Sequence, residues 1–107
     1  MSTVYYSPED FGLTMVGDVE AAGGYEFDML AVWRRDEDGA LFWSTDSGCS
    51  CFSPFDGMES PDEHLERIRD VAAFAQAARA WSRKSYRMHT RDQVESLIRR
   101  ARRRWVA

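Results

Sequence analysis

The sequence predicts an α+β domain in which a three-stranded antiparallel meander is covered on one face by two C-terminal helices. Alternating apolar residues separated by Gly-containing turns indicate the strands, and two helix-start signals in the second half indicate the helices. The length of 107 residues and the hydrophobic content of 44% are typical of one globular domain, which we expect to span residues 1–107.

A short helical turn precedes the first strand. Ser7 as a cap and Pro8 at the first helical position predict this turn, and Gly12 ends it. The first strand is then expected from Leu13 to about Glu20. Residues 21–24, Ala-Ala-Gly-Gly, supply the turn to the next strand.

Residues 25–35 give the clearest strand signal. Leu30 and Val32 make one face of this strand partly apolar, so coverage of both faces is open. Residues 36–39 predict a hairpin turn, and residues 41–45 form the returning strand. The other face of the central strand carries Tyr25, Phe27, Met29, Ala31 and Trp33.

Both helices are predicted to begin at a capping box, in which a cap hydroxyl and an acidic or amide side chain three residues later satisfy free backbone N–H groups. The first box, residues 60–63, opens a helix that reaches about Arg83, with residues 69–70 as the place where it would break. The second box, residues 90–93, opens the last helix. We expect the apolar stripe of that helix to dock on the sheet through Val94, Leu97, Ile98, Ala101 and Trp105.

Charge is divided between the two halves of the chain. Residues 1–66 hold 15 acidic residues and 2 arginines, which gives a net charge of −13. Residues 67–107 hold 12 lysines and arginines and 3 acidic residues, which gives +9, so the overall −4 conceals two opposite fields. Such fields attract partners of the complementary sign, although pairing of the two halves within the molecule is open.

Five arginines within six residues make the last helix strongly basic. One interpretation is a solvated face near the negative end of the helix dipole. Guanidinium groups also suit the phosphates of nucleic acid or of an anionic lipid surface, and equally an acidic protein. The acidic first half would repel nucleic acid unless the two fields face opposite ways. We therefore predict a protein partner bound by Arg99, Arg100, Arg103 and Arg104.

The acidic half suggests a hypothesis of its own, the imitation of nucleic-acid phosphates by surface carboxylates. Residues 36–38 form only a turn, however, and Glu26 with Asp28 is the ordinary polar side of a strand. Ordinary surface acidity is the simpler interpretation.

Residues 47–58 form an irregular loop whose role the sequence leaves open. Cys49 and Cys51 are one residue apart, which disfavours a disulfide between them, so we expect reduced thiols, at least one of them buried in a structural loop. Phe52 and Phe55 are expected to close the end of the sheet.

A thiol or zinc protein centred on Cys49 and Cys51 is a further alternative. Thiolate and imidazole are preferred zinc ligands, so His64 and His89 could complete a site, but structural sites usually place paired cysteines two to four residues apart. A catalytic cysteine needs a neighbouring base, and the adjoining Asp46 disfavours a thiolate. We therefore expect no metal and no cofactor.

Four segments within about residues 5–60 carry a resemblance: residues 5–8 (Tyr-Tyr-Ser-Pro), 11–14 (Phe-Gly-Leu-Thr), 25–28 (Tyr-Glu-Phe-Asp) and 46–55, with its Gly-Cys-Ser-Cys and Ser-Pro-Phe elements. In these segments the chain resembles a group of small uncharacterised proteins encoded by phages of actinobacteria. The Gly-Cys-Ser-Cys loop is the specific element, and Phe52 departs from the pattern, in which Pro is expected. The resemblance implies a phage gene product in the host bacterial cytoplasm and transfers no activity or site residue.

No catalytic constellation stands out, whether paired carboxylates with a base, a Gly-rich phosphate loop or a nucleophile with its histidine. We expect a non-enzymatic interaction protein that binds and modulates a host macromolecule, a protein in the first place. A small nucleic-acid-binding protein that uses the arginine-rich helix is the alternative. The N-terminal residues lack a secretory signal and no run of about 18 apolar residues occurs, which favours a soluble protein of the host cytoplasm.

Overall fold

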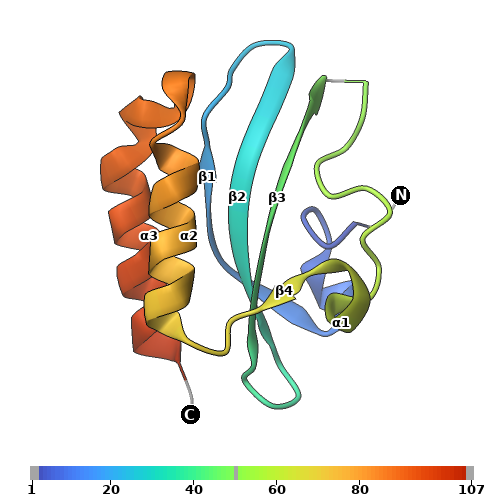
Figure 1. Cartoon of the computed structure of the whole chain (residues 1–107). Coiled ribbons are helices and arrows are strands. Elements are labelled where there is room, and N and C mark those ends of the chain that lie inside the picture. The colour runs from blue at the N-terminus through green and yellow to red at the C-terminus, as the bar shows by residue number, and fades with distance from the viewer. Residues whose placement is uncertain (1–2, 50, 106–107) are drawn as a thin grey trace.

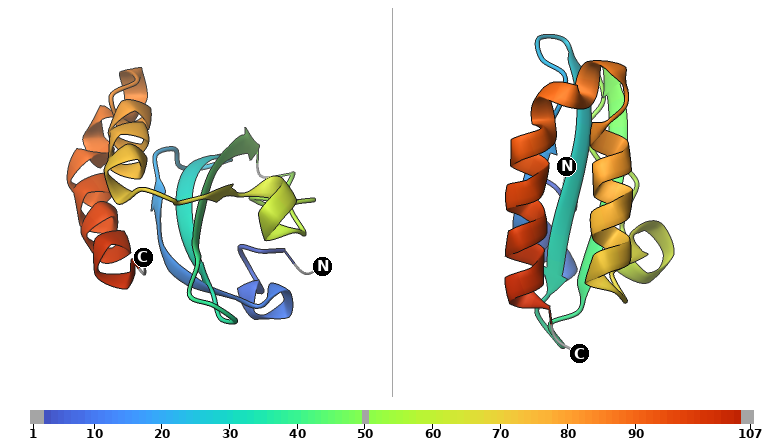
Figure 2. Two further views of the ribbon diagram at one scale, coloured as in Figure 1. Left: turned by 60° about the horizontal axis from the view of Figure 1, so that its bottom comes forward. Right: turned by 60° about the vertical axis from the view of Figure 1, so that its left-hand side comes forward.

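The computed structural model of the chain describes residues 3–49 and 51–105, which form three layers (Figure 1). Two long helices lie on one side of an antiparallel sheet, and the N-terminal segment with a one-turn helix lies on the other side (Figure 2). The predicted α+β class is confirmed. In chain order the elements are the 3₁₀ helix η1 (Pro8–Phe11), β1 (Leu13–Glu20), β2 (Glu26–Arg35), β3 (Leu41–Cys49), α1 (Pro61–His64), β4 (Glu66–Arg67), α2 (Val71–Ser82), the 3₁₀ helix η2 (Ser85–Thr90) and α3 (Arg91–Arg104).

The sheet has four strands in the order β1-β2-β3-β4, all antiparallel, so the predicted count of three was wrong. The first three strands form the expected meander, and β3 continues four residues beyond the predicted end at Thr45. The additional strand β4 pairs with Phe42 and Trp43. Two residues are too few to show the alternating pattern by which a strand is recognised in a sequence.

A glycine in β1 lets α3 approach the sheet closely. The register between β1 and β2 shifts between Met15 and Gly17, and Gly17 then stands opposite Val32 on the helix side. A Cβ atom at Gly17 would lie 2.9 Å from Leu97 Cδ1 and 2.8 Å from Arg100 Nη1. Both distances are shorter than van der Waals contact, so the missing side chain sets the distance between this helix and this strand.

The helix expected from residue 60 to about Arg83 is interrupted. After the single turn α1 the chain is extended, with the Ile68 N–H donating to the Leu41 carbonyl at 2.8 Å, and α2 begins only after Asp70, whose carboxylate accepts from the Ala72 N–H at 3.0 Å. The reason lies in the burial of Leu65 and Ile68, which pack on opposite faces of the sheet. Two residues only three positions apart would lie on the same side of a helix. The chain is therefore extended where it crosses the edge of the sheet from one core to the other.

The last helix is confirmed, since Val94, Leu97, Ile98 and Ala101 are buried and the half-buried Trp105 packs against them. Ser7, Ser60 and Thr90 occupy the N-cap positions as predicted, but the expected side-chain hydrogen bonds of the caps are not made. The Thr90 hydroxyl instead donates to the Arg87 carbonyl at 2.7 Å and lies 3.0 Å from the Ser82 hydroxyl.

Both faces of the sheet carry a hydrophobic core. On the helix side, Leu30 and Val32 of β2 pack against α2 and α3. The N-terminal segment and the loop after β3 cover the far side, where the Trp33 Nε1–H donates to the Val4 carbonyl at 2.9 Å. The far-side core consists of Val4, Leu13, Phe27, Met29, Ala31, Trp33, Phe42, Phe55 and Leu65. The prediction of one covered face was therefore incomplete.

Candidate functional site in the helical layer

Opposite charges lie on different layers of the fold. The helical layer, residues 71–104, holds ten lysines and arginines and two acidic residues. The sheet carboxylates of Asp18, Glu20 and Asp46 stand opposite Ala31 and Met29, whose side chains belong to the far-side core. These carboxylates and the basic helical layer therefore face opposite ways.

All four arginines predicted to bind a partner are exposed, but they lie in two directions. Arg99 and Arg103, one helical turn apart, lie opposite the buried stripe of α3 and point away from the sheet. Arg100 extends over β1 at Gly17, and Arg104 follows it one turn later on the same flank. No ion pair joins any of the four to a carboxylate within residues 3–49 and 51–105.

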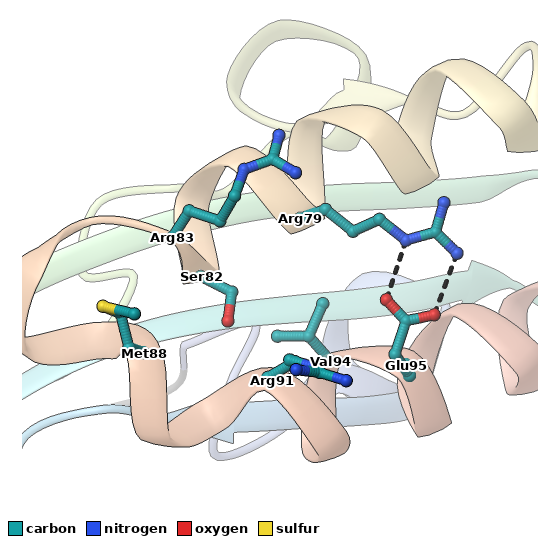
Figure 3. A pocket seen from close by; sticks show the side chains of 7 residues that line it. All are labelled: Arg79, Ser82, Arg83, Met88, Arg91, Val94 and Glu95. Atoms are coloured by element: carbon teal, nitrogen blue, oxygen red, sulfur yellow. Dashed lines mark hydrogen bonds and ion pairs between the residues drawn. The ribbon is translucent and has the colours of Figure 1, made fainter.

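A groove of about 220 Å³ runs between α2 and α3 on their outer side (Figure 3). The buried Val94 lies between the two helices at its base, and the exposed Met88 of η2 lies at one end. Arg83 of α2 and Arg91 of α3 flank it from opposite sides, and both are exposed. Neither makes an ion pair with a described carboxylate, although Arg91 lies close enough to Glu95 to help lower the pKa of that carboxyl.

The other end of the groove is crossed by an ion pair between the helices. Arg79 donates to both carboxylate oxygens of Glu95, with Nε···Oε2 at 2.7 Å and Nη2···Oε1 at 2.8 Å (Figure 3). These hydrogen bonds raise the pKa of Arg79 and hold the pKa of Glu95 below its ordinary value. Both side chains are partly exposed, so the pair orients the two helices more than it stabilises them.

A buried ion pair fixes the segment that connects α2 with α3. Arg87 donates to both oxygens of Asp28 in β2, through Nε at 2.6 Å and Nη2 at 3.1 Å, and the Tyr86 hydroxyl donates to the same carboxylate at 2.6 Å. The bond to Asp28 raises the pKa of Arg87 and the pKa of Tyr86. The guanidinium also lies 4.8 Å from the ring centroid of Trp81. The pair joins a residue of the acidic first half of the sequence to a residue of the basic second half. It fixes η2 on β2 and thereby positions Met88 at the groove.

The expectations for the loop after β3 need correction. Cys49 and Cys51 form a disulfide across a Cα–Cα distance of 5.4 Å, and both residues are exposed rather than buried. Ser50, between them, lies outside the described residues. Phe52 is 64% exposed and does not close the sheet.

Phe55 does close the far side of the sheet, as expected. It is fully buried and meets the ring of Trp33 edge to face at a centroid distance of 5.0 Å. Its backbone N–H donates to the Asp46 carboxylate at 2.7 Å, which holds the loop against β3.

The residues of the zinc hypothesis are not brought together. His64 lies in α1, where its Nδ1 accepts from the Ser60 N–H at 3.1 Å, and His89 lies in η2. Both cysteines are engaged in the disulfide. Across the described part of the chain, no group of three or more His, Cys, Asp and Glu side chains is arranged to hold a metal ion.

Sequence reasoning missed the groove because its lining comes from α2, η2 and α3, and the ion pairs that shape it join residues 16 and 59 positions apart. The available signal was the position of Arg79 and Arg83, which are one turn apart on a helix and therefore share a face.

No helix in the described ranges is both long and apolar enough to cross a membrane. No curated protein and no solved structure matches the chain. A family model does match, over residues 2–104, which is nearly the whole length. The chain therefore belongs to the family described as "Domain of unknown function (DUF7574)".

Proposed function

We propose that this protein is a non-enzymatic, phage-encoded interaction protein that binds and modulates a host protein in the bacterial cytoplasm, and that its basic helical layer is the binding surface. The separation of charge between the two layers is the observation that supports this proposal. Arg83, Arg91, Arg99 and Arg103 lie on the outer side of that layer without an ion pair to a described carboxylate. Arginines of this kind attract an acidic surface and set the orientation in which it docks.

The residues beside the arginines favour a protein as the partner. Met88 is 66% exposed at one end of the groove, and Tyr86 in the same segment is 59% exposed. Arginine, methionine and aromatic residues are the types enriched at protein–protein interfaces.

A small nucleic-acid-binding protein is the second candidate. Asp18, Glu20 and Asp46 lie on the far face of the sheet, which weakens the repulsion that would otherwise oppose the approach of phosphates to the helices. This observation keeps the alternative open, and it predicts affinity that falls steeply with salt.

Capture from an actinobacterial lysate, with and without nuclease treatment, distinguishes the two candidates. We expect tagged protein to retain one host protein in stoichiometric amount after nuclease treatment. Loss of every retained protein on nuclease treatment, together with tight binding of DNA or RNA at physiological salt, would favour the second candidate instead.

A further inference from the structure

The groove between α2 and α3 is lined by apolar side chains and by arginines. Val94 lies buried at its base and the exposed Met88 lies at one end. Arg83 from α2 and Arg91 from α3 line it on opposite sides, with the Arg83 guanidinium lying over α2 (Figure 3). The Ser82 hydroxyl is already paired with Thr90 at 3.0 Å. A ligand of this groove therefore meets apolar side-chain atoms above Val94 and beside Met88, with an arginine on each side that makes no ion pair to a described carboxylate.

The volume of the groove limits what can enter it. At about 220 Å³ it is smaller than the roughly 300–1,000 Å³ of sites that enclose a drug-sized molecule. A single apolar side chain of a larger partner suits this volume, while the rest of that partner lies across the helices. The Arg79–Glu95 pair closes one end, so the entering group comes from the outer side.

We propose that this groove binds an acidic peptide segment of the partner protein, with one apolar side chain inserted over Val94 and flanking carboxylates bound by Arg83 and Arg91. Guanidinium groups bind carboxylates through paired hydrogen bonds, so acidic residues on both sides of the apolar residue find a partner. Burial of the apolar side chain supplies affinity that a purely electrostatic contact lacks. The inference rests on the proposed function and names the chemistry of its partner.

A labelled peptide tests this directly. The probe is a short fluorescein-labelled peptide in which one leucine is flanked on both sides by aspartates and glutamates, and the control peptide carries serine in place of the leucine. Fluorescence anisotropy of each peptide with the full-length protein at physiological salt gives the two affinities. We expect the serine peptide to bind about tenfold more weakly, because it loses the buried apolar side chain.

Matched protein variants locate the contact. Arg83→Ser with Arg91→Ser removes the two charges beside the groove, whereas Arg99→Ser with Arg103→Ser removes two charges from the outward face of α3. All four side chains are exposed, so both variants should fold like wild type. We expect the first variant to bind the leucine peptide about tenfold more weakly or worse, and the second to bind with little change. Met88→Ser, which keeps every charge, should also weaken binding.

Three results would overturn the inference. Equal losses in both double variants with no preference for leucine would show long-range attraction alone, which leaves the proposed function standing. Absence of peptide binding by wild type would exclude the acidic peptide as the occupant, while capture of a host protein would still support the proposed function. An oligonucleotide of equal charge that binds as tightly as the leucine peptide would assign the groove to nucleic acid.

Discussion

Asp28 and Arg87 are 59 residues apart in the sequence and form a buried ion pair that ties the α2–α3 connection to the central strand. The side chain of Asp28 is 4% exposed and that of Arg87 is 17% exposed, so both charges are largely removed from water. Each charge stabilises the other, because a buried charge without a partner is energetically costly. The pair therefore holds η2, and with it one end of the groove, in place.

Removal of one partner of this pair should destabilise the fold strongly. We expect Arg87→Ala to lower the free energy of unfolding by about 3–5 kcal/mol, because Asp28 then keeps a buried charge and, among the described side chains, only the Tyr86 hydroxyl as a partner. Urea denaturation measures the change. Arg83→Ala, which removes an exposed arginine nearby, serves as the control and should have little effect. Equal stability of the two variants would show that the pair does not hold the connection.

The close approach of α3 to β1 predicts that a side chain at Gly17 must displace the ends of the Leu97 and Arg100 side chains, of which Leu97 is buried. Gly17→Ala should lower the free energy of unfolding by about 1–3 kcal/mol, because the new methyl group meets Leu97 and Arg100. Gly23→Ala is the matched control, since a Cβ atom there meets nothing within 4 Å. Thermal unfolding compares the two variants. Equal melting temperatures would mean that α3 does not lie against β1 at this position.

Two phenols predict a loss of stability at alkaline pH. The pKa of Tyr5 is raised by burial and by its 2.6 Å hydrogen bond to Asp18, and the pKa of Tyr86 is raised by its bond to Asp28. Because the folded-state pKa values lie above the ordinary value of 10.0, the stabilisation is complete below that pH. It is lost as the pH rises from there through the folded-state values.

Denaturation at a series of alkaline pH values tests this for wild type and for Tyr5→Phe with Tyr86→Phe. The variant should be less stable at neutral pH and should lose less stability on going to alkaline pH. An identical pH dependence would exclude these two hydroxyl groups as its source.

The disulfide between Cys49 and Cys51 should contribute little to stability. Both residues are exposed and the bond closes a very short loop, so it removes little freedom from the unfolded chain. Cys49→Ser with Cys51→Ser should lower the free energy of unfolding by about 1.5 kcal/mol or less, well below the effect of a disulfide that closes a long loop. Thermal unfolding with and without reductant checks this. A large decrease in melting temperature would show that the loop depends on the bond.

Much of the fold follows from residue patterns, because its main elements are long enough to show their period. β1 alternates between buried and more exposed residues, β2 is a mainly apolar run that is buried on both faces, and α3 carries Val94, Leu97, Ile98 and Ala101 at helical spacing. The crossing between α1 and α2 could not be predicted in the same way. In the sequence, Leu65 and Ile68 fit the apolar stripe of a continuous helix as well as they fit an extended segment. The structure shows that they belong to different cores, one on each face of the sheet.

The basic surface of α3 could be predicted from the sequence, but the groove could not, and none of the four predicted arginines lines it. The basic character of α3 and the exposure of Arg99 and Arg103 follow from sequence alone, because charged residues fill the face opposite the buried stripe. The groove depends on the distance between α2 and α3 and on the contact between Arg79 and Glu95. Neither the distance between the two helices nor the contact between these side chains can be predicted from a local pattern of residues.

The central claim is that the basic helical layer binds an acidic partner, and the affinity of charge variants for the captured host protein tests it most directly. One variant changes Arg83, Arg91, Arg99 and Arg103, the arginines of the outer side, to Ser, and a control variant neutralises the exposed acidic residues Glu37, Asp56, Glu59 and Glu63. The account predicts that the arginine variant folds normally and loses most of its affinity, while the control binds like wild type. Unchanged affinity of the arginine variant would contradict it.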